Sequence, residues 1–225
     1  MYKRFIFFFF ILHYSLLSGQ LNFYEKGQKA FYWGISLGVN SSDFSVDRQP
    51  LSGANDTIRN VSSRMSPGFN LGLIGNWQFN RYFDLRFIPN MTFGEKIIEF
   101  QTENMLLENK ISTTYISFPV LIRFKAEPVN DWRLFLVGGL KYEYNINSQK
   151  KSDAEPQKII LKKDGLSAEY GVGLQYFFPY FIFSPEIKFS HSLFNMYDSN
   201  QSDLNNSAIK SLFPRALTLT LNFEG

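Results

Sequence analysis

The residues best suited to catalysis are His191 and the serines on either side of it, Ser190 and Ser192. A histidine can act as the base for a serine nucleophile when the two side chains lie within hydrogen-bond distance. The surrounding residues favour a strand, in which adjacent side chains point to opposite faces. Neither serine therefore shares a face with His191, and we expect no Ser–His catalysis.

The sequence shows no motif for a metal site, a nucleotide-binding site or a calcium site. The chain has no cysteine, which excludes thiolate metal sites, and it has no nucleotide-binding loop. The run Asp198, Asn200 and Asp203 lacks the glycine and the final glutamate of a calcium-binding loop. We therefore expect no cofactor and no metal.

Eight charged residues form a second group of candidates, with both signs equally represented. They are Asp84, Arg86, Arg123, Lys141, Glu143, Glu169, Glu186 and Lys188. Each lies in a segment whose apolar residues occupy every second position, so the charges share one strand face and the apolar side chains share the other. Because an unpaired buried charge is costly, we expect the two signs to pair if that face is enclosed.

Period-two alternation of this kind predicts eight β-strands. The clearest is the last, in which Leu217, Leu219 and Leu221 alternate with Thr218 and Thr220. The predicted strands are residues 33–40, 69–79, 82–100, 111–125, 132–145, 166–177, 180–193 and 216–224. An even strand number is typical of single-chain outer-membrane barrels. We therefore predict an all-β fold, an eight-stranded antiparallel up-and-down transmembrane β-barrel.

The connections between these strands alternate between long and short. The long ones are residues 41–67, 101–110, 146–165 and 195–215, and the short ones are residues 80–81, residues 126–131 and Pro179. Outer-membrane barrels have long extracellular loops and short periplasmic turns. We therefore expect both termini in the periplasm, and we expect the last strand to close the barrel by pairing with residues 34–40.

The N-terminus predicts a secretory signal peptide. Lys3 and Arg4 precede a short apolar run, residues 5–12, and the small residues Ser18 and Gly19 follow it. Charge, a short apolar stretch and then small residues is the order found in such peptides. We assign residues 1–20 to the signal peptide and residues 21–225 to the barrel domain.

Aromatic residues make up 18% of the chain, a high content that a barrel can place on lipid and at both membrane interfaces. Tryptophan and tyrosine prefer the interface, and several lie at the strand ends assigned to the periplasm. The predicted belt comprises Trp33, Trp77, Tyr82, Trp132, Tyr176 and Tyr180, with Tyr32 beside them. A soluble eight-stranded barrel is the alternative, and it requires a polar outer face. The net charge of +3 is too small to suggest a nucleic-acid partner.

The interior of an eight-stranded barrel is just wide enough for side chains to fill. The predicted interior face combines small residues with the eight charges, so we expect a closed lumen, bridged by ion pairs, that does not conduct ions. Pro89, Pro119 and Pro185 lie inside predicted strands, where proline cannot donate to the ladder. We expect bulges or local bends at these three positions.

The last signal is spread over eight stretches of the predicted barrel: residues 32–40, 67–74, 82–89, 93–96, 118–119, 137–139, 169–173 and 179–190. The most specific is Pro179-Tyr180-Phe181-Ile182-Phe183-Ser184-Pro185-Glu186-Ile187-Lys188-Phe189-Ser190. In these stretches the sequence resembles the PorT (SprT) family of outer-membrane barrels from the type IX secretion and gliding-motility system. The resemblance implies an outer-membrane protein needed for the export of cargo and for gliding where cells glide, and it implies no catalysis.

The barrel pattern and the family resemblance together lead to three functional hypotheses, of which the first is what the resemblance implies. We predict a non-enzymatic accessory barrel that contacts outer-membrane lipid and other type IX secretion proteins, including a larger translocon barrel. A structural or adhesive barrel that acts through its surface loops is the first alternative. The second is a lipid A-modifying enzyme, in which a serine follows the histidine by two residues; that position is Leu193 here.

Overall fold

The computed structural model describes residues 29–48, 58–102, 106–146, 162–197 and 209–225. The signal peptide that we predict, residues 1–20, and the acidic run 198–203 lie outside the described residues. Within the described part of the chain, no helix is long and apolar enough to cross a membrane.

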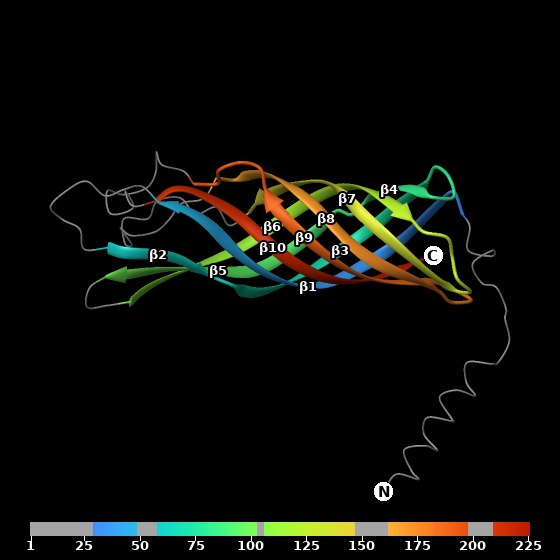
Figure 1. The fold of residues 1–225 in the computed structure, drawn as a ribbon, viewed down its shortest axis with the longest axis horizontal. Coiled ribbons are helices and arrows are strands. Elements are labelled where there is room, and N and C mark those ends of the chain that lie inside the picture. Colours follow the sequence, from blue (N-terminus) through green and yellow to red (C-terminus); the bar gives the residue numbers. More distant parts are fainter. Residues whose placement is uncertain (1–28, 49–57, 103–105, 147–161, 198–208) are drawn as a thin grey trace, which may run out of the picture.

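The described residues form ten β-strands. They are β1 (Phe31–Arg48), β2 (Ile58–Arg64), β3 (Ser66–Gln78), β4 (Phe83–Phe87), β5 (Asn90–Thr102), β6 (Leu106–Lys125), β7 (Trp132–Asn145), β8 (Asp164–Phe177), β9 (Ile182–Ser192) and β10 (Ile209–Glu224). All pair antiparallel in one sheet, and the sheet closes because β1 pairs with β10 on one side and with β3 on the other (Figure 1). Both β2 and β3 pair with β5, and both β4 and β5 lie between β3 and β6. Strands β2 and β3 therefore form one interrupted strand of the barrel wall, and β4 and β5 form another. Counted in this way, the wall has the eight strands that the alternation predicts.

The stagger of the strands, together with their number, sets the width of the barrel. It is found by following the residue pairs from strand to strand once around the barrel. This path begins at Ser42 on β1 and returns to β1 at Tyr32, ten residues nearer the N-terminus. The residues on this path are Ser42, Ala216, Ser190, Glu169, Gly139, Leu121, Arg86, Asn76 and Tyr32. The offset is the shear of the barrel, and a closed eight-stranded wall with such a stagger leaves room for side chains and little more.

The outer face of the barrel is apolar. On β1, for example, the exposed side chains include Trp33, Ile35, Leu37 and Val39, and the other walls carry equivalent rows. Soluble monomeric proteins rarely expose contiguous apolar patches larger than a few hundred Å². An apolar band around a closed barrel instead matches a surface that lies in lipid, so the soluble alternative does not describe this molecule.

The closing pair confirms the prediction that the last strand pairs with residues 34–40, and the pairing continues to Arg48. Gly34 on β1 faces Glu224 on β10, and Asn40 faces Thr218. The first residues of β1, the last residues of β10 and the short turns all lie at one end of the barrel (Figure 1). We call this the turn end and the opposite end the loop end.

Much of the chain that we predict to be long connections is strand. Strand β1 runs on to Arg48, β2 begins at Ile58, and only residues 103–105 separate β5 from β6. The predicted connections 41–67 and 101–110 were therefore wrong in extent, and so was the end of 195–215, because β10 begins at Ile209. The extensions carry polar residues on both faces, as at Ser41 and Ser42, so the alternation that reveals a strand disappears there.

The prolines inside the walls do not cause bulges. Residue pairing keeps its register past Pro89, Pro119 and Pro185, although the wall strand is interrupted at Pro89, between β4 and β5. The Ile88 N–H still donates to the Pro119 carbonyl at 3.2 Å. Pro119 has no N–H to donate back to Ile88. The Ile88 carbonyl instead accepts a hydrogen bond from Asn90 Nδ2 at 2.9 Å. The bulges expected at these positions were therefore wrong. At Pro119 the Asn90 side chain replaces the missing donor, whereas at Pro185 the pairing of β9 with β8 lapses for two residues and resumes in the same register.

Replacing Leu219 with Lys is expected to lower the free energy of unfolding by about 2–4 kcal/mol, because it puts a charge on the lipid-facing surface near the middle of the apolar band. Urea unfolding of the protein in lipid vesicles, followed by tryptophan fluorescence, measures this loss. The matched control is Thr218→Asn, which keeps a polar side chain on the interior face and is expected to change stability much less. Equal losses in both variants would contradict this assignment of the two faces.

Candidate functional site

A network of charged side chains fills the barrel interior near the turn end. We call it the turn-side cluster, and its members are Tyr32, Asp84, Arg86, Arg123, Lys125, Glu186 and Glu224, each at most 3% exposed. Arg86 lies 2.9 Å from Glu186 and also pairs with Glu224. Arg123 Nε donates to Asp84 Oδ2 at 2.9 Å, and Lys125 pairs with the same carboxylate. Three cations thus meet three carboxylates, which is the balance that buried charges need.

The turn-side cluster ties together the two strands that close the barrel. Glu224 from β10 lies 3.5 Å from Arg123 on β6. The Tyr32 hydroxyl, from β1, accepts a hydrogen bond from Arg123 and donates to Asp84 at 3.2 Å. The first and last strands are therefore joined across the lumen as well as through their own ladder.

An apolar cluster lies next to the turn-side cluster on the side of the loop end. Its members are Ile74, Ile88, Leu121, Phe135 and Val137, all at most 4% exposed. The Phe135 ring lies 5.1 Å from the Arg123 guanidinium and 5.8 Å from that of Arg86. A side chain at Gly173 would collide with this ring, so the glycine provides the space that Phe135 occupies. Interior positions at this level are therefore packed with side chains.

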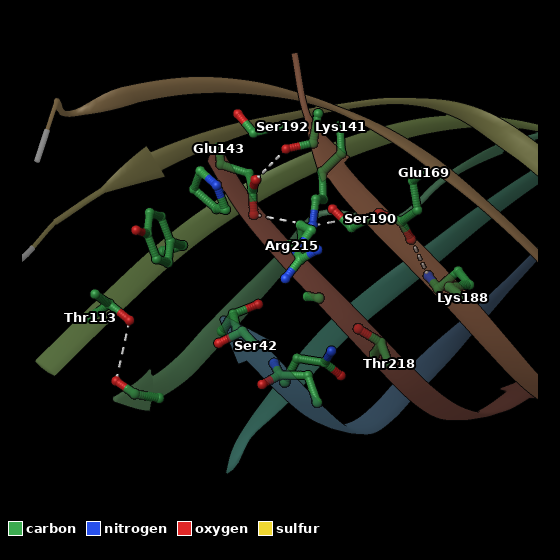
Figure 2. Close-up of a pocket in the computed structure, with 18 of the residues that line it drawn as sticks. Ser42, Thr113, Lys141, Glu143, Glu169, Lys188, Ser190, Ser192, Arg215 and Thr218 are labelled. Carbon is green, nitrogen blue, oxygen red and sulfur yellow. Dashed lines mark hydrogen bonds and ion pairs between the residues drawn. The ribbon is translucent and has the colours of Figure 1, made fainter. Parts of the chain in front are cut away.

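The loop half of the interior contains a polar chamber with a cavity volume of about 70 Å³ (Figure 2). We call it the loop-side chamber. Four of its charged lining residues pair with each other: Lys141 lies 3.1 Å from Glu143, and Lys188 lies 2.8 Å from Glu169. Ser167 donates to Glu143 at 2.8 Å. Most of the remaining lining consists of hydroxyl and amide side chains from β1, β3, β5, β6, β9 and β10.

The structure brings the eight charges predicted from the sequence into the barrel interior, in two groups. Asp84, Arg86, Arg123 and Glu186 belong to the turn-side cluster, and Lys141, Glu143, Glu169 and Lys188 line the loop-side chamber. The two groups meet where Lys188 lies 3.5 Å from Glu186. Every one of the eight has a partner of opposite charge. The interior is nevertheless not filled evenly, because the chamber occupies its loop half.

The predicted aromatic belt lies at the turn end. Trp33, Trp77, Tyr82, Trp132 and Tyr180 have exposed side chains there, and Tyr176 packs on Trp132 with ring centroids 4.3 Å apart. Tyr32 does not belong with them. It is 3% exposed and points into the lumen, so its placement beside the belt was wrong: it is one residue before Trp33 on the same strand and faces the other way.

Sequence reasoning missed several interior residues. Lys125, Arg133 and Glu224 are buried, and Arg133 Nε donates to Gln175 at 2.9 Å. Strand parity was the signal that could have found two of them, since Lys125 is two residues after Arg123 and Glu224 is two after Asn222. Phe135 and Leu121 were missed because large apolar side chains were assigned to lipid alone.

The one histidine in the described residues is on the outer surface. His191 is exposed, whereas Ser190 and Ser192 are buried on the interior face, in agreement with the opposite faces predicted for them. Within the part of the chain that the structure describes, no group of His, Cys, Asp or Glu side chains could hold a metal ion.

Comparison with known proteins identifies relatives of this fold. The family model described as "Outer membrane protein beta-barrel domain" matches residues 20–198, whereas the search of curated proteins gave no match. The outer membrane protein OprG of Pseudomonas aeruginosa has a similar structure, with a TM-score of 0.56 and 14% identity over 88% of this chain and 97% of that chain. AlkL, determined in lipid bilayers, has a TM-score of 0.50 and 10% identity over 88% and 92% of the two chains. Similarity at these identities establishes the fold alone.

Replacing Arg123 with Met is expected to destabilise the barrel by about 3–5 kcal/mol, because it leaves Asp84 and Glu224 buried with fewer cations. Urea unfolding in vesicles measures the change. The matched control is Arg81→Met, since Arg81 lies 2.6 Å from Glu127 in an exposed pair, and a pair of that kind contributes about 0–1 kcal/mol. Similar losses in the two variants would show that the turn-side cluster is not the buried network described above.

Purified protein in a planar lipid bilayer is expected to show no steady conductance, because the turn-side cluster and the apolar cluster occlude the lumen below the chamber. The measurement compares the protein with buffer containing detergent only and with a conducting porin at the same amount. Steady large currents that scale with the amount of protein would contradict an occluded lumen.

Proposed function

The chain belongs to the outer membrane protein β-barrel domain family, and we propose that it is a non-enzymatic accessory component of the type IX protein secretion system. In this role it resides in the outer membrane with both termini in the periplasm. It is needed for the export of cargo proteins, and for gliding motility in cells that glide.

Support for the pathway comes from the sequence. The resemblance to the PorT (SprT) family extends from residue 32 to residue 190, and its most specific stretch, residues 179–190, contains the short turn before β9 and most of β9. Glu186 and Lys188 in this stretch point into the lumen, where Glu186 binds Arg86. The part of the chain with the most specific resemblance is therefore also part of the interior network.

The occluded lumen is the observation that carries the accessory role. A channel for folded or unfolded cargo needs a continuous aqueous path, and here Arg86, Arg123 and Phe135 occupy the lumen with at most 2% of their surface exposed. Cargo therefore passes through another protein. We propose that this barrel acts beside a larger translocon barrel, with lipid and that partner as its contacts in the membrane.

A structural or adhesive role is the second candidate, and one observation favours it. Strands β2, β5 and β6 extend the wall at the loop end (Figure 1), which presents a protein surface beyond the apolar band. Lipid A modification has less support, because the faces of His191 and its neighbouring serines differ and Leu193 occupies the position of the required serine.

Deleting the gene is expected to abolish export of type IX cargo, which then accumulates in the periplasm. Immunoblots of culture medium and periplasm against one cargo protein measure this. The adhesive alternative predicts normal export together with reduced attachment to surfaces, and normal export would refute the proposed role in secretion.

Two complementing alleles make the deletion experiment specific. Wild-type protein and the exposed-pair variant Arg81→Met should both restore export, and blots for an unrelated outer-membrane barrel should show that the envelope is intact. Crosslinking followed by purification from the outer membrane then tests the partner. Recovery of a large translocon barrel is expected, and its absence while export depends on the gene would place this protein elsewhere in the pathway.

A further inference from the structure

We propose that the loop-side chamber binds a short, uncharged saccharide. The inference goes beyond the accessory role in secretion and does not depend on it. It rests on three properties of the chamber: its charges are already paired, several of its polar side chains make no hydrogen bond within the described residues, and its strands are paired on both sides at this level.

The charged residues of the chamber do not call for a charged ligand. Lys141 lies within 3.1 Å of Glu143 and 3.7 Å of Glu169, and Lys188 lies within 2.8 Å of Glu169. At the rim, Arg215 pairs with Asp43 at 2.7 Å. A charged ligand would have to break these pairs and leave a buried charge without its partner, which is costly.

Three asparagines on neighbouring strands line the same side of the chamber. Each faces a glycine on the adjacent strand: Asn70 faces Gly38, Asn40 faces Gly68, and Asn90 faces Gly72. A Cβ atom at Gly38 or Gly68 would collide with the amide oxygen of the facing asparagine. The glycines therefore let the amides lie against the wall, which keeps the chamber open while lining it with donors and acceptors.

Several of these groups are available to a ligand. Within the described residues, the side chains of Asn40, Asn70, Ser190 and Thr218 make no hydrogen bond, and all four line the chamber. An amide provides two donors and an acceptor, and a hydroxyl both donates and accepts. Sugar hydroxyls have the same dual character, so a saccharide can satisfy such a lining without carrying a charge.

The chamber suits a saccharide better than a peptide. Peptides bound to β-proteins commonly use the free edge of a sheet and apolar pockets for alternate side chains. The wall at this level has no free edge, because its strands are paired on both sides, as β10 is with β1 and β9. Its apolar lining is small and includes Met196, Pro214 and Ala216.

The test is a glycan array probed with the full-length protein in lipid nanodiscs. The array carries neutral oligosaccharides, sulfated and sialylated oligosaccharides, and a set of short peptides. Binding to neutral oligosaccharides is expected, and calorimetry with the strongest of them then gives the dissociation constant. Binding to anionic glycans alone, to peptides alone or to nothing on the array would overturn the proposal.

Variants locate the binding to the chamber. The pair Asn40→Leu with Asn70→Leu keeps side-chain size and removes two amides, and it is expected to weaken binding at least ten-fold. Ser190→Ala is a milder second variant with an intermediate loss. The matched control is Phe69→Leu, one residue before Asn70 and on the lipid face, which is expected to leave binding unchanged. Folding of each variant is checked by the change of gel mobility on heating that a folded barrel shows. Unaltered binding by both folded chamber variants would place the saccharide elsewhere and overturn the proposal.

Discussion

Every backbone N–H and C=O that lies in lipid must find a partner within the protein, because no water is present to supply one. This chain meets that constraint by pairing β1 with both β10 and β3. The other features follow from that closure. A closed wall has an inside and an outside, so the side chains along each strand alternate between the interior and lipid. Because the barrel is narrow, its interior must be either packed with side chains or filled with water.

The two halves of the interior resolve this choice differently. Near the turn end, Arg86, Arg123 and Lys125 are fully enclosed and each is matched by a carboxylate. In the loop half, glycines face asparagines across β1, β3 and β5, and a polar space remains. The same barrel thus combines the closed turn-side cluster with the loop-side chamber. The cluster serves the stability of the barrel, and the chamber leaves space in which a ligand can bind.

The sequence predicted best the parts of the chain whose two faces meet different surroundings. Strand β7 was predicted as residues 132–145 and is Trp132–Asn145, because lipid lies on one side of it and the interior on the other. Where polar residues occupy both faces, as in the extensions beyond Ser41, the alternation vanishes and strands were taken for loops.

The interior partners could not be predicted because they depend on closure. Arg86 and Glu224 are 138 positions apart in the chain, and local pattern carries no information about which residues face each other across a lumen. The same holds for the chamber, since its existence depends on which interior positions carry large side chains. Phe135 occupies space left by Gly173 on the neighbouring strand, a complementarity that appears only after β7 and β8 have paired.

The position of Glu224 has a consequence for the order in which the molecule forms. It lies at the end of β10, yet it binds arginines from β4 and β6, which come much earlier in the chain. Before β10 docks, Arg86, Arg123 and Lys125 have only Asp84 and Glu186 as partners in the turn-side cluster, and one cation lacks its counter-charge. The last strand therefore completes the ladder and balances the charges of the turn-side cluster in the same event. A chain whose synthesis stops short of residue 224 is left with an open wall and an excess positive charge, a combination that disfavours its insertion into lipid.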